Sequence, residues 1–344
     1  MNPAIRTVVV DDSAFVRKTV RAMLAEHPGI QVVGVARDGE EALELVEQLR
    51  PDVVTCDLTM PRLDGVGFVR RQMERRPVPI LILTASPDDG EPAMDALSAG
   101  AVDLVRKPTA LATDELLVIR DQLVDKLRAA ARVPVSQLRP TSFARPVALP
   151  VVANRKVDIV VIGVSTGGPQ ALRRLIPEFP ANFPVPIAMV LHMPVGYTAL
   201  FAEKLNEISA LSVLEAKDGE VLRPGVALLA SAGRHLVLQR ERPGRVVGRL
   251  ALQPLDKNHR PSVDVLFQSA AEIYGNRVLG VVMTGMGDDG RQGAAWIKAQ
   301  GGTILTEDEK SCIIYGMPRS VVESGLSDRS VPLSELATSI IQSL

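Results

Sequence analysis

The sequence predicts an α/β protein made of two parallel sheets joined by a linker. Short apolar runs rich in Val, Ile and Leu alternate with amphipathic stretches in residues 1–125 and again in residues 157–344. The runs lack the polar alternation of half-exposed strands, so helices should cover both faces of each sheet. The alternation stops over residues 126–156. A chain of 344 residues is long enough for two domains that each bury a core.

The first half carries the strand and helix signals of a five-stranded parallel sheet. Its strand-like runs are RTVVVDD (6–12), QVVGVA (31–36), DVVTCD (52–57), PILILTA (79–85) and AVDLVRKP (101–108). Amphipathic stretches such as 13–28 and 38–51 separate them and predict helices. We therefore expect one βα domain over residues 1–125.

Residues 126–156 predict an interdomain linker. The segment holds seven basic and no acidic residues, and four prolines interrupt it. We expect a helix that ends near Ala131, followed by an extended chain. The flanking domains differ in charge, with 14 basic against 21 acidic residues in 1–125 and 18 against 19 in 157–344. The nearly neutral second half argues against a DNA-binding output domain, which is usually basic.

The second half predicts a doubly wound, mostly parallel sheet with a small antiparallel hairpin. Its strand-like runs are DIVVIGVS (158–165), IAMVLHMP (187–194), RVLGVVMTG (277–285) and GGTILTED (301–308). Residues 235–254 read as two strands around a turn at Pro243-Gly244.

The composition indicates in which cellular compartment the protein works. No apolar run reaches membrane-spanning length, and two aspartates follow the first apolar run too early for a signal peptide. The two cysteines, Cys56 and Cys312, stand apart without metal-binding companions, which is typical of a reducing compartment. We expect a cytoplasmic protein without disulfides.

Polar residues follow the predicted strands of the first half. They are Asp11, Asp12, Asp57, Thr84 and Lys107. The carboxyl ends of strands in an open parallel sheet converge on one crevice, where three carboxylates would repel one another unless they share a cation. An all-oxygen site suits Mg²⁺. Aspartates also end strands and cap helices, as Asp12 could, but five such residues at successive strand ends favour a site.

The motifs VVVDDS, DLTMPRLDG, LTA and RKP make residues 4–125 closely resemble the receiver domains of two-component response regulators. The resemblance implies a flavodoxin-like sheet and phosphorylation of Asp57 by a histidine kinase. It implies Mg²⁺ held by Asp12, Asp57 and the backbone carbonyl of Thr59, with Asp11 assisting. Thr84 and Lys107 would sense the phosphoryl group.

Two residues depart from the receiver pattern. Leu104 stands where receivers usually place an aromatic switch residue, so the sequence does not predict how the phosphorylation signal is relayed. Thr59 replaces a more usual acidic residue. The implied Mg²⁺ ligand is its backbone carbonyl, which is the same whatever the side chain.

The stretch VIGVSTGGPQ places Ser165 in a glycine-rich corner after a predicted strand. Gly163 to Gly167 fit G-x-S-x-G, which could expose a nucleophile or cradle a phosphate. A serine nucleophile needs a base and an orienting acid. His192 ends a predicted strand, and the loop MTGMGDDG offers Asp288 and Asp289, which could instead be simple turn formers.

The second half resembles the CheB family of chemotaxis protein-glutamate methylesterases. The shared motifs are IGVSTGGPQAL, LHMPVGYTALFAEKLN, EAKDGEVLRPG, HRPSVDVLFQSAA, MTGMGDDG and YGMPRSV. The resemblance implies Ser165 as nucleophile, His192 as base and Asp289 as orienting acid. The Met286 backbone N–H would serve the oxyanion hole, with Thr166 near the substrate. SAG replaces the family's PGG before His235.

The family resemblance implies an activity and its control. The activity is hydrolysis of glutamyl γ-methyl esters on methyl-accepting chemoreceptors, with glutamine deamidation in some members. The unphosphorylated receiver would block the Ser165 cleft, and phosphorylation would uncover it. The alternatives are a second domain that binds a partner without catalysis, or one that binds a nucleotide at GVSTGG. The latter lacks an acidic ribose partner about 20 residues further on.

Overall fold

A computed structural model describes residues 3–85, 89–107, 113–134, 156–242 and 244–344. The chain divides into two compact units, residues 1–141 and 142–344. The predicted linker falls largely on residues 135–155, outside the described residues, so its boundaries at 126 and 156 stay a prediction. The helix before it ends at Ala130, one residue from the predicted end.

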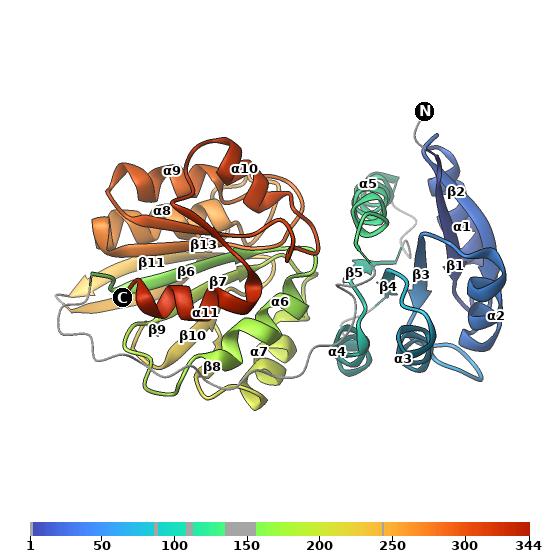
Figure 1. Ribbon diagram of the computed structural model, residues 1–344, viewed down its shortest axis with the longest axis horizontal. Helices are drawn as coiled ribbons and strands as arrows, with labels where there is room; N and C mark the ends of the chain where they lie inside the picture. Colours follow the sequence, from blue (N-terminus) through green and yellow to red (C-terminus); the bar gives the residue numbers. More distant parts are fainter. Residues whose placement is uncertain (1–2, 86–88, 108–112, 135–155, 243) are drawn as a thin grey trace. The chain divides into compact units, whose positions relative to one another are not determined.

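The first unit is a five-stranded parallel sheet with the strand order β2-β1-β3-β4-β5. The strands are β1 (Ile5–Val10), β2 (Ile30–Ala36), β3 (Val53–Asp57), β4 (Ile80–Thr84) and β5 (Asp103–Arg106). The helices are α1 (Ala14–Ala25), α2 (Gly39–Leu49), α3 (Gly65–Arg75), α4 (Gly90–Ala99) and α5 (Thr113–Ala130). Helix α1 packs with α5, and α3 packs with α2 and α4 (Figure 1). This is the predicted flavodoxin-like sheet.

The strand order of the first unit positions its polar cluster. The chain runs from β1 to β2 on one side and then crosses to β3 on the other, so β1 and β3 are neighbours at the switch point. Ligands bind outside the carboxyl ends of strands at such a point. The first helix is capped by Ser13, whose Oγ accepts the Val16 N–H at 3.4 Å. The alternative interpretation of Asp12 as the N-cap is wrong.

The second unit has a seven-stranded, entirely parallel sheet with the order β15-β14-β13-β6-β7-β10-β8. Its strands are β6 (Ile159–Val164), β7 (Ile187–Leu191), β8 (Ser212–Glu215), β10 (Val226–Leu229), β13 (Val278–Val282), β14 (Thr303–Glu307) and β15 (Arg329–Val331). The helices are α6 (Gly168–Leu175), α7 (Thr198–Glu207), α8 (Val263–Tyr274), α9 (Arg291–Ala299), α10 (Met317–Glu323) and α11 (Leu333–Gln342). The predicted doubly wound parallel sheet is confirmed.

A small antiparallel sheet completes the second unit. The predicted hairpin is β11 (His235–Arg242) and β12 (Arg245–Ala251), and β9 (Glu220–Val221) adds a third strand that was not predicted. Pro243 of the predicted turn lies outside the described residues, and Gly244 has a positive φ of 77°. Helix α8 packs on β11.

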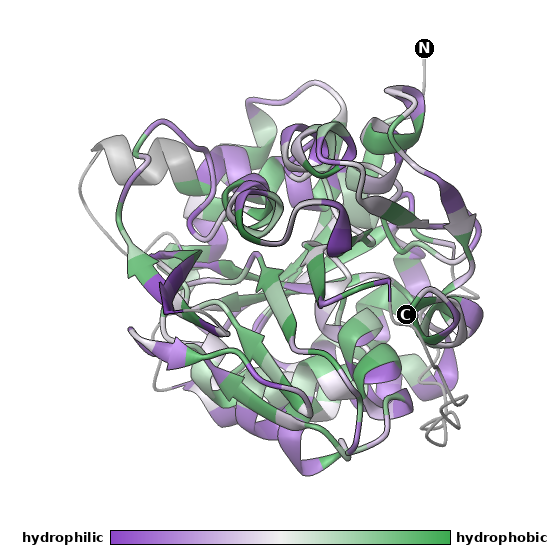
Figure 2. Cartoon of the chain, turned by 90° about the vertical axis from the view of Figure 1, so that its left-hand side faces the viewer, coloured by the Kyte–Doolittle hydropathy of each residue, from purple (hydrophilic) through white to green (hydrophobic). Residues whose placement is uncertain are grey.

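The core of the second unit lies along its central strands. Every residue of β6, β7 and β13 is buried, as expected of strands covered on both faces. Figure 2 shows hydrophobic colour concentrated on the strands and hydrophilic colour on the outer helices and loops. The sheet's switch point lies between β6 and β13, the place where parallel α/β sheets usually bind their ligands.

None of the helices in the described part of the chain is both long and apolar enough to cross a membrane.

Candidate active site and phosphoacceptor site

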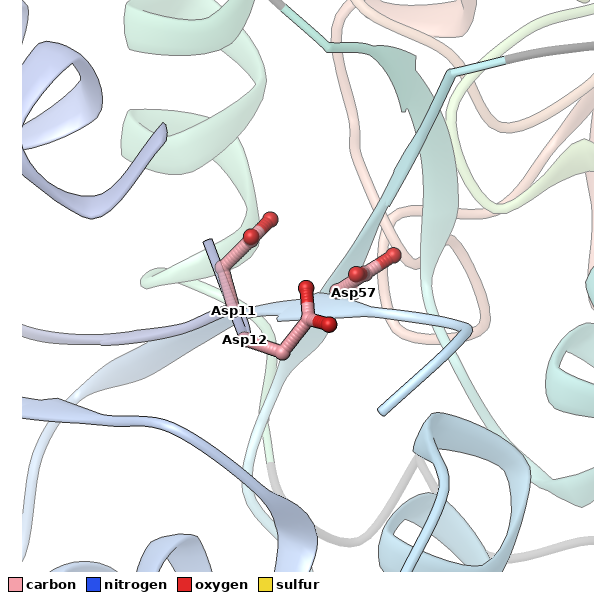
Figure 3. Close-up of side chains that lie close together, drawn as sticks. All are labelled: Asp11, Asp12 and Asp57. Atoms are coloured by element: carbon pink, nitrogen blue, oxygen red, sulfur yellow. The ribbon is translucent and has the colours of Figure 1, made fainter. Parts of the chain in front are cut away.

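Three carboxylates gather at the switch point of the first sheet (Figure 3). Asp11 and Asp12 follow β1 and Asp57 ends β3, and one oxygen of each lies within 4.8 Å of the others. Asp11 and Asp57 are buried, whereas Asp12 is exposed. Tertiary structure thus brings together the three acidic residues that the sequence singled out.

Lys107 supplies a positive charge to this acidic cluster. Its Nζ lies 2.7 Å from Asp57 Oδ2 and 3.0 Å from Asp11 Oδ2. Burial acts to lower the pKa of Lys107, but the two carboxylates outweigh it and raise that pKa. Burial also raises the pKa of Asp57, against the opposing effect of Lys107. One ammonium cannot balance three carboxylates, so the oxygens fit a hard divalent cation such as Mg²⁺.

The remaining receiver residues lie around the cluster. The Thr59 N–H donates to Asp57 Oδ1 at 3.3 Å, which folds this loop over the carboxylate. Thr84 ends β4, and its carbonyl accepts the Lys107 N–H at 2.7 Å. Its Oγ1 donates to Asp89 at 3.1 Å. Leu104 is fully buried in β5.

Ser165 lies in a tight corner directly after β6. Its N–H donates to the Thr284 carbonyl at 3.0 Å, and its own carbonyl accepts the Gly168 N–H at 2.7 Å. Gly167 precedes α6 with φ 78°, a conformation that favours glycine. A Cβ on Gly285 would lie 2.8 Å from the Ser165 Cβ, so the loop after β13 packs directly against the serine. Tertiary contacts therefore fix this corner from two strands.

His192 occupies the equivalent position on the neighbouring strand. Val164 pairs with Leu191 in the register of β6 and β7, and the His192 N–H donates to the Val164 carbonyl at 3.1 Å. The ring Nε2 lies 2.9 Å from Asp289 Oδ2, whereas the buried Nδ1 has no hydrogen-bond partner among the described residues, Ser165 included. An ionised carboxylate only accepts, so we assign the proton to Nε2 and the free lone pair to Nδ1.

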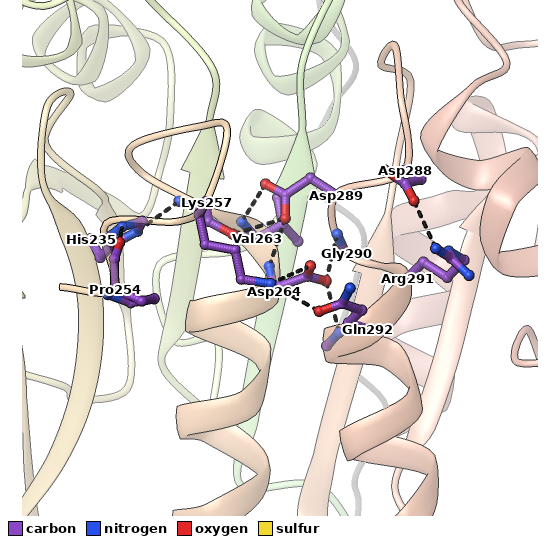
Figure 4. Close-up of polar contacts among 12 residues, drawn as sticks. His235, Pro254, Lys257, Val263, Asp264, Asp288, Asp289, Gly290, Arg291 and Gln292 are labelled. Carbon is purple, nitrogen blue, oxygen red and sulfur yellow. Dashed lines mark hydrogen bonds and ion pairs between the residues drawn. The ribbon is translucent and has the colours of Figure 1, made fainter.

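Asp289 is held in place by the start of α8. Its Oδ1 accepts the Ser262 hydroxyl at 2.8 Å and the Asp264 N–H at 3.0 Å, and its Oδ2 accepts the Val263 N–H at 2.8 Å (Figure 4). Burial acts to raise the pKa of Asp289, but the hydrogen bond from His192 and the backbone donors hold that pKa below its ordinary value. The carboxylate is therefore charged and fixed at neutral pH.

Asp289 precedes α9 and binds the start of α8, and Asp264, at the start of α8, in turn binds the start of α9. Its Oδ1 accepts the Gly290 and Gly293 N–H groups at the start of α9, at 2.9 and 2.8 Å, and Lys257 lies 3.2 Å from Oδ2. Each of two helix N-termini thus holds a carboxylate from the other segment, which helix dipoles favour. This exchange fixes the loop that carries Asp289.

The structure separates the two adjacent aspartates of the MTGMGDDG loop. Asp288 is exposed and pairs with Arg291 at 2.8 Å (Figure 4). The Asp289 side chain is only 9% exposed and contacts His192. Met286 lies in the same loop, half-buried, three residues from Asp289. Thr166 is fully buried beside Ser165, and within the described part of the chain its Oγ1 has no hydrogen-bond partner. The predicted site residues of the second unit thus lie in the loops that follow β6, β7 and β13, which are neighbours in the sheet.

Two histidines and one serine beside the site gave no clear signal in the sequence. The exposed His259 stacks on His192, with ring centroids 4.1 Å apart and planes 19° from parallel. His235 is structural, because its Nδ1 accepts the Ser262 N–H and its Nε2 donates to the Pro254 carbonyl at 3.0 Å. His259 and Ser262 belong to the motif HRPSVDVLFQSAA, which the sequence shares with the CheB family. The motif by itself did not indicate what either residue does.

The fold and the two sites define a class of protein. A receiver unit with a clustered acidic site precedes an α/β unit whose serine corner, imidazole and carboxylate lie at the carboxyl ends of parallel strands. Residues 160–340 match the CheB methylesterase family, and residues 7–118 match the response regulator receiver domain. The chain therefore belongs to the CheB methylesterase family and is a carboxylic ester hydrolase.

Relatives support this membership over the full chain. It is 50% identical over 331 residues to protein-glutamate methylesterase/protein-glutamine glutaminase 5 of Myxococcus xanthus, covering 96% of this chain and 95% of the relative. It is 42% identical to protein-glutamate methylesterase/protein-glutamine glutaminase of Symbiobacterium thermophilum, and the match covers 99% of this chain and 97% of the relative. The crystal structure of the Thermotoga maritima CheB methylesterase catalytic domain is 42% identical, covers 55% of this chain and 99% of that one, and gives a TM-score of 0.53.

Proposed function

We propose that Ser165, His192 and Asp289 form the catalytic triad of an esterase that hydrolyses glutamyl γ-methyl esters on chemoreceptors. One observation carries the assignment. Asp289 holds Nε2 of the imidazole at 2.9 Å, while the buried Nδ1 has no hydrogen-bond partner among the described residues. His192 directly follows β7, the strand that pairs with the strand before Ser165. The base is then Nδ1, the reverse of the trypsin-like arrangement, in which Nε2 faces the serine.

The proposed reaction has two halves. His192 Nδ1 takes the proton from Ser165 Oγ while that oxygen attacks the ester carbonyl, and the Met286 N–H donates to the developing oxyanion. Collapse breaks the bond to the methoxy oxygen, which takes the proton from Nδ1 and leaves as methanol. Water, deprotonated by the same nitrogen, then hydrolyses the acyl-enzyme to glutamate and frees Ser165. General-base help contributes typically ~10²–10⁴-fold, and one oxyanion donor ~10²–10³-fold.

Thr166 and glutamine substrates extend the proposal. Thr166 lies next to Ser165, and its Oγ1 has no hydrogen-bond partner among the described residues, which supports a contact with bound substrate. A side-chain amide could undergo the same sequence of steps with ammonia as the leaving group. We therefore include receptor glutamine deamidation, an activity that the names of the relatives also contain.

The first unit would control the esterase. We propose that a histidine kinase phosphorylates Asp57 and that this relieves inhibition by the receiver. Asp11, Asp12, Asp57 and the Thr59 carbonyl would hold Mg²⁺, which supplies charge neutralisation for phosphoryl transfer. Lys107 and Thr84 would contact the phosphoryl group. The acidic cluster, with one balancing ammonium, supports this assignment.

The buried free cysteines, Cys56 and Cys312, agree with a cytoplasmic location.

Methanol release from methylated chemoreceptor tests both parts. We expect wild-type protein to release methanol, faster with a phosphodonor, and Ser165→Ala to release none. Asp57→Asn should keep the basal rate and lose the stimulation. Equal release by wild type and Ser165→Ala would reject the triad. Unchanged stimulation of Asp57→Asn would reject the phosphorylation mechanism, and no release from any variant would favour a non-catalytic binding domain.

A further inference from the structure

Glu307 is a fully buried carboxylate behind the active site. It is the last residue of β14 and has an exposed fraction of 0%. Its Oε2 accepts the Thr284 N–H at 2.9 Å, and its Oε1 accepts the Ser311 hydroxyl at 3.1 Å. Within the described part of the chain, no ion pair reaches it. Neither the triad nor the sequence motifs explain a buried acid at this position.

Thr284 connects Glu307 to the nucleophile. The N–H of Thr284 donates to Glu307, and its carbonyl accepts the Ser165 N–H at 3.0 Å. Its Oγ1 donates to the Thr166 carbonyl at 3.0 Å and accepts the Ile314 N–H at 2.9 Å. One residue thus hydrogen-bonds with the carboxylate, with both residues of the serine corner and with the loop before α10.

We propose that Glu307 is a positioning residue, which fixes the Ser165 corner through Thr284 by offering a buried hydrogen-bond acceptor. This rests on the proposed role of Ser165 as nucleophile. Without the acceptor, the Thr284 N–H would be buried and unsatisfied, and the loop would shift to find a partner. Such a shift moves Ser165 directly, because Gly285 packs against its Cβ and Thr284 holds its N–H. A misplacement of about 1 Å can lower a rate ~10²-fold.

The acceptor rather than the charge is the required property. Burial raises the pKa of Glu307 to about 7, so both protonation states exist near neutrality. The charged and titratable groups around it are Arg174 of α6 and the Cys312 thiol, whose Sγ lies 3.7 Å from the Glu307 carbonyl oxygen. The protonated acid keeps one oxygen for the Thr284 N–H and can donate to Ser311. Glutamine offers the same two functions and should replace glutamate.

The test compares full-length Glu307→Gln, Glu307→Leu and Glu307→Asp, with Glu309→Leu as the control. Glu309 is an exposed carboxylate two residues away. Labelling with a fluorophosphonate, taken to completion and located by mass spectrometry, counts the reactive serines in each preparation. Methanol release from methylated receptor then gives KM and kcat per reactive serine. This normalisation removes any loss that comes only from unfolded protein.

We expect Glu307→Leu to lower kcat per reactive serine about 10- to 100-fold with KM changed less than about threefold. Glu307→Asp keeps the charge but draws the oxygens away from Thr284, so it should also lose kcat. Glu307→Gln and Glu309→Leu should stay within about threefold of wild type.

The proposal is overturned if Glu307→Leu keeps a wild-type kcat per reactive serine, or if Glu307→Gln falls as far as Glu307→Leu. If Glu307→Leu does not fold, kcat per reactive serine is compared between Glu307→Gln and Glu307→Asp. The proposal is then overturned if Glu307→Asp keeps the wild-type value or if Glu307→Gln falls as far as Glu307→Asp. Failure of the proposed function gives a different result, namely wild-type protein that carries no label on Ser165.

Discussion

Replacing Glu307 with glutamine should stabilise the second unit at alkaline pH. The carboxylate is fully buried without an ion-pair partner among the described residues, and its burial raises the pKa from 4.5 to about 7. Charging it in the folded protein is therefore unfavourable. Glutamine keeps an oxygen for the Thr284 N–H and donates to the Ser311 hydroxyl, so the two hydrogen bonds persist without the charge.

The size and direction of the effect follow from the pKa of Glu307. The pKa is higher in the folded than in the unfolded protein, so the folded state binds the proton more tightly. The contribution of Glu307 to wild-type stability is then most favourable below pH 4.5, declines as the pH rises towards 7, and levels off above that. The difference from 4.5 to about 7 corresponds to about 3 kcal/mol at about 1.36 kcal/mol per pKa unit. The advantage of Glu307→Gln should grow by about this amount over that range.

Trp296 allows the unfolding of the second unit to be followed separately. It is the only tryptophan of the chain and lies on α9 with 44% of its surface exposed. Urea unfolding followed by its fluorescence, at several values between pH 4.5 and 8.5, gives the free energy of unfolding for wild type and Glu307→Gln. Glu309→Gln removes the same charge from an exposed position and serves as the control.

A constant difference in the free energy of unfolding between wild type and Glu307→Gln across this pH range would refute the reasoning. So would a pH-dependent gain of equal size in Glu309→Gln, because the effect would then come from general charge and not from burial.

Three further predictions concern the two sites. Asp289→Asn should lower kcat by about 10²–10⁴-fold, because a neutral amide neither fixes the imidazole proton on Nε2 nor stabilises the imidazolium. The control Asp288→Asn should stay near wild type. Equal losses of methanol release in the two variants would contradict the assignment. His259→Ala should lower kcat/KM about 2- to 10-fold by removing the ring stacked on His192, and His259→Phe should restore it; equal losses in both variants would show that stacking is not what matters. Chelation of Mg²⁺ with EDTA should abolish stimulation by a small-molecule phosphodonor and leave basal methanol release unchanged; stimulation that survives chelation would contradict the acidic cluster as the Mg²⁺ site.

Much of the architecture could be predicted because strands and helices have strong local signals. The runs that became β3, β6, β7 and β13 are apolar without alternation, and every residue of these strands is buried. In β1 the last four residues, Thr7 to Val10, are buried as well. Strands β8, β9, β10 and β15 were not predicted, because runs of two to four residues are too short to show a periodicity. The sequence left Asp12 as a possible cap of α1, because Asp12 and Ser13 are both good N-caps and only the backbone geometry decides between them.

The amino-acid sequence alone determined which chemical groups stand at the ends of the strands: an acidic cluster with a lysine, a serine in a glycine corner, a histidine and a pair of aspartates. These groups come from motifs that are local in the chain. Only the tertiary structure decided that Asp289 and not Asp288 contacts the histidine, that the histidine Nδ1 has no hydrogen-bond partner among the described residues, and that Glu307 is linked to the Ser165 corner through Thr284. Those relations depend on parallel-strand register and on helix N-termini that lie far apart in sequence, and no local pattern encodes a contact between distant segments.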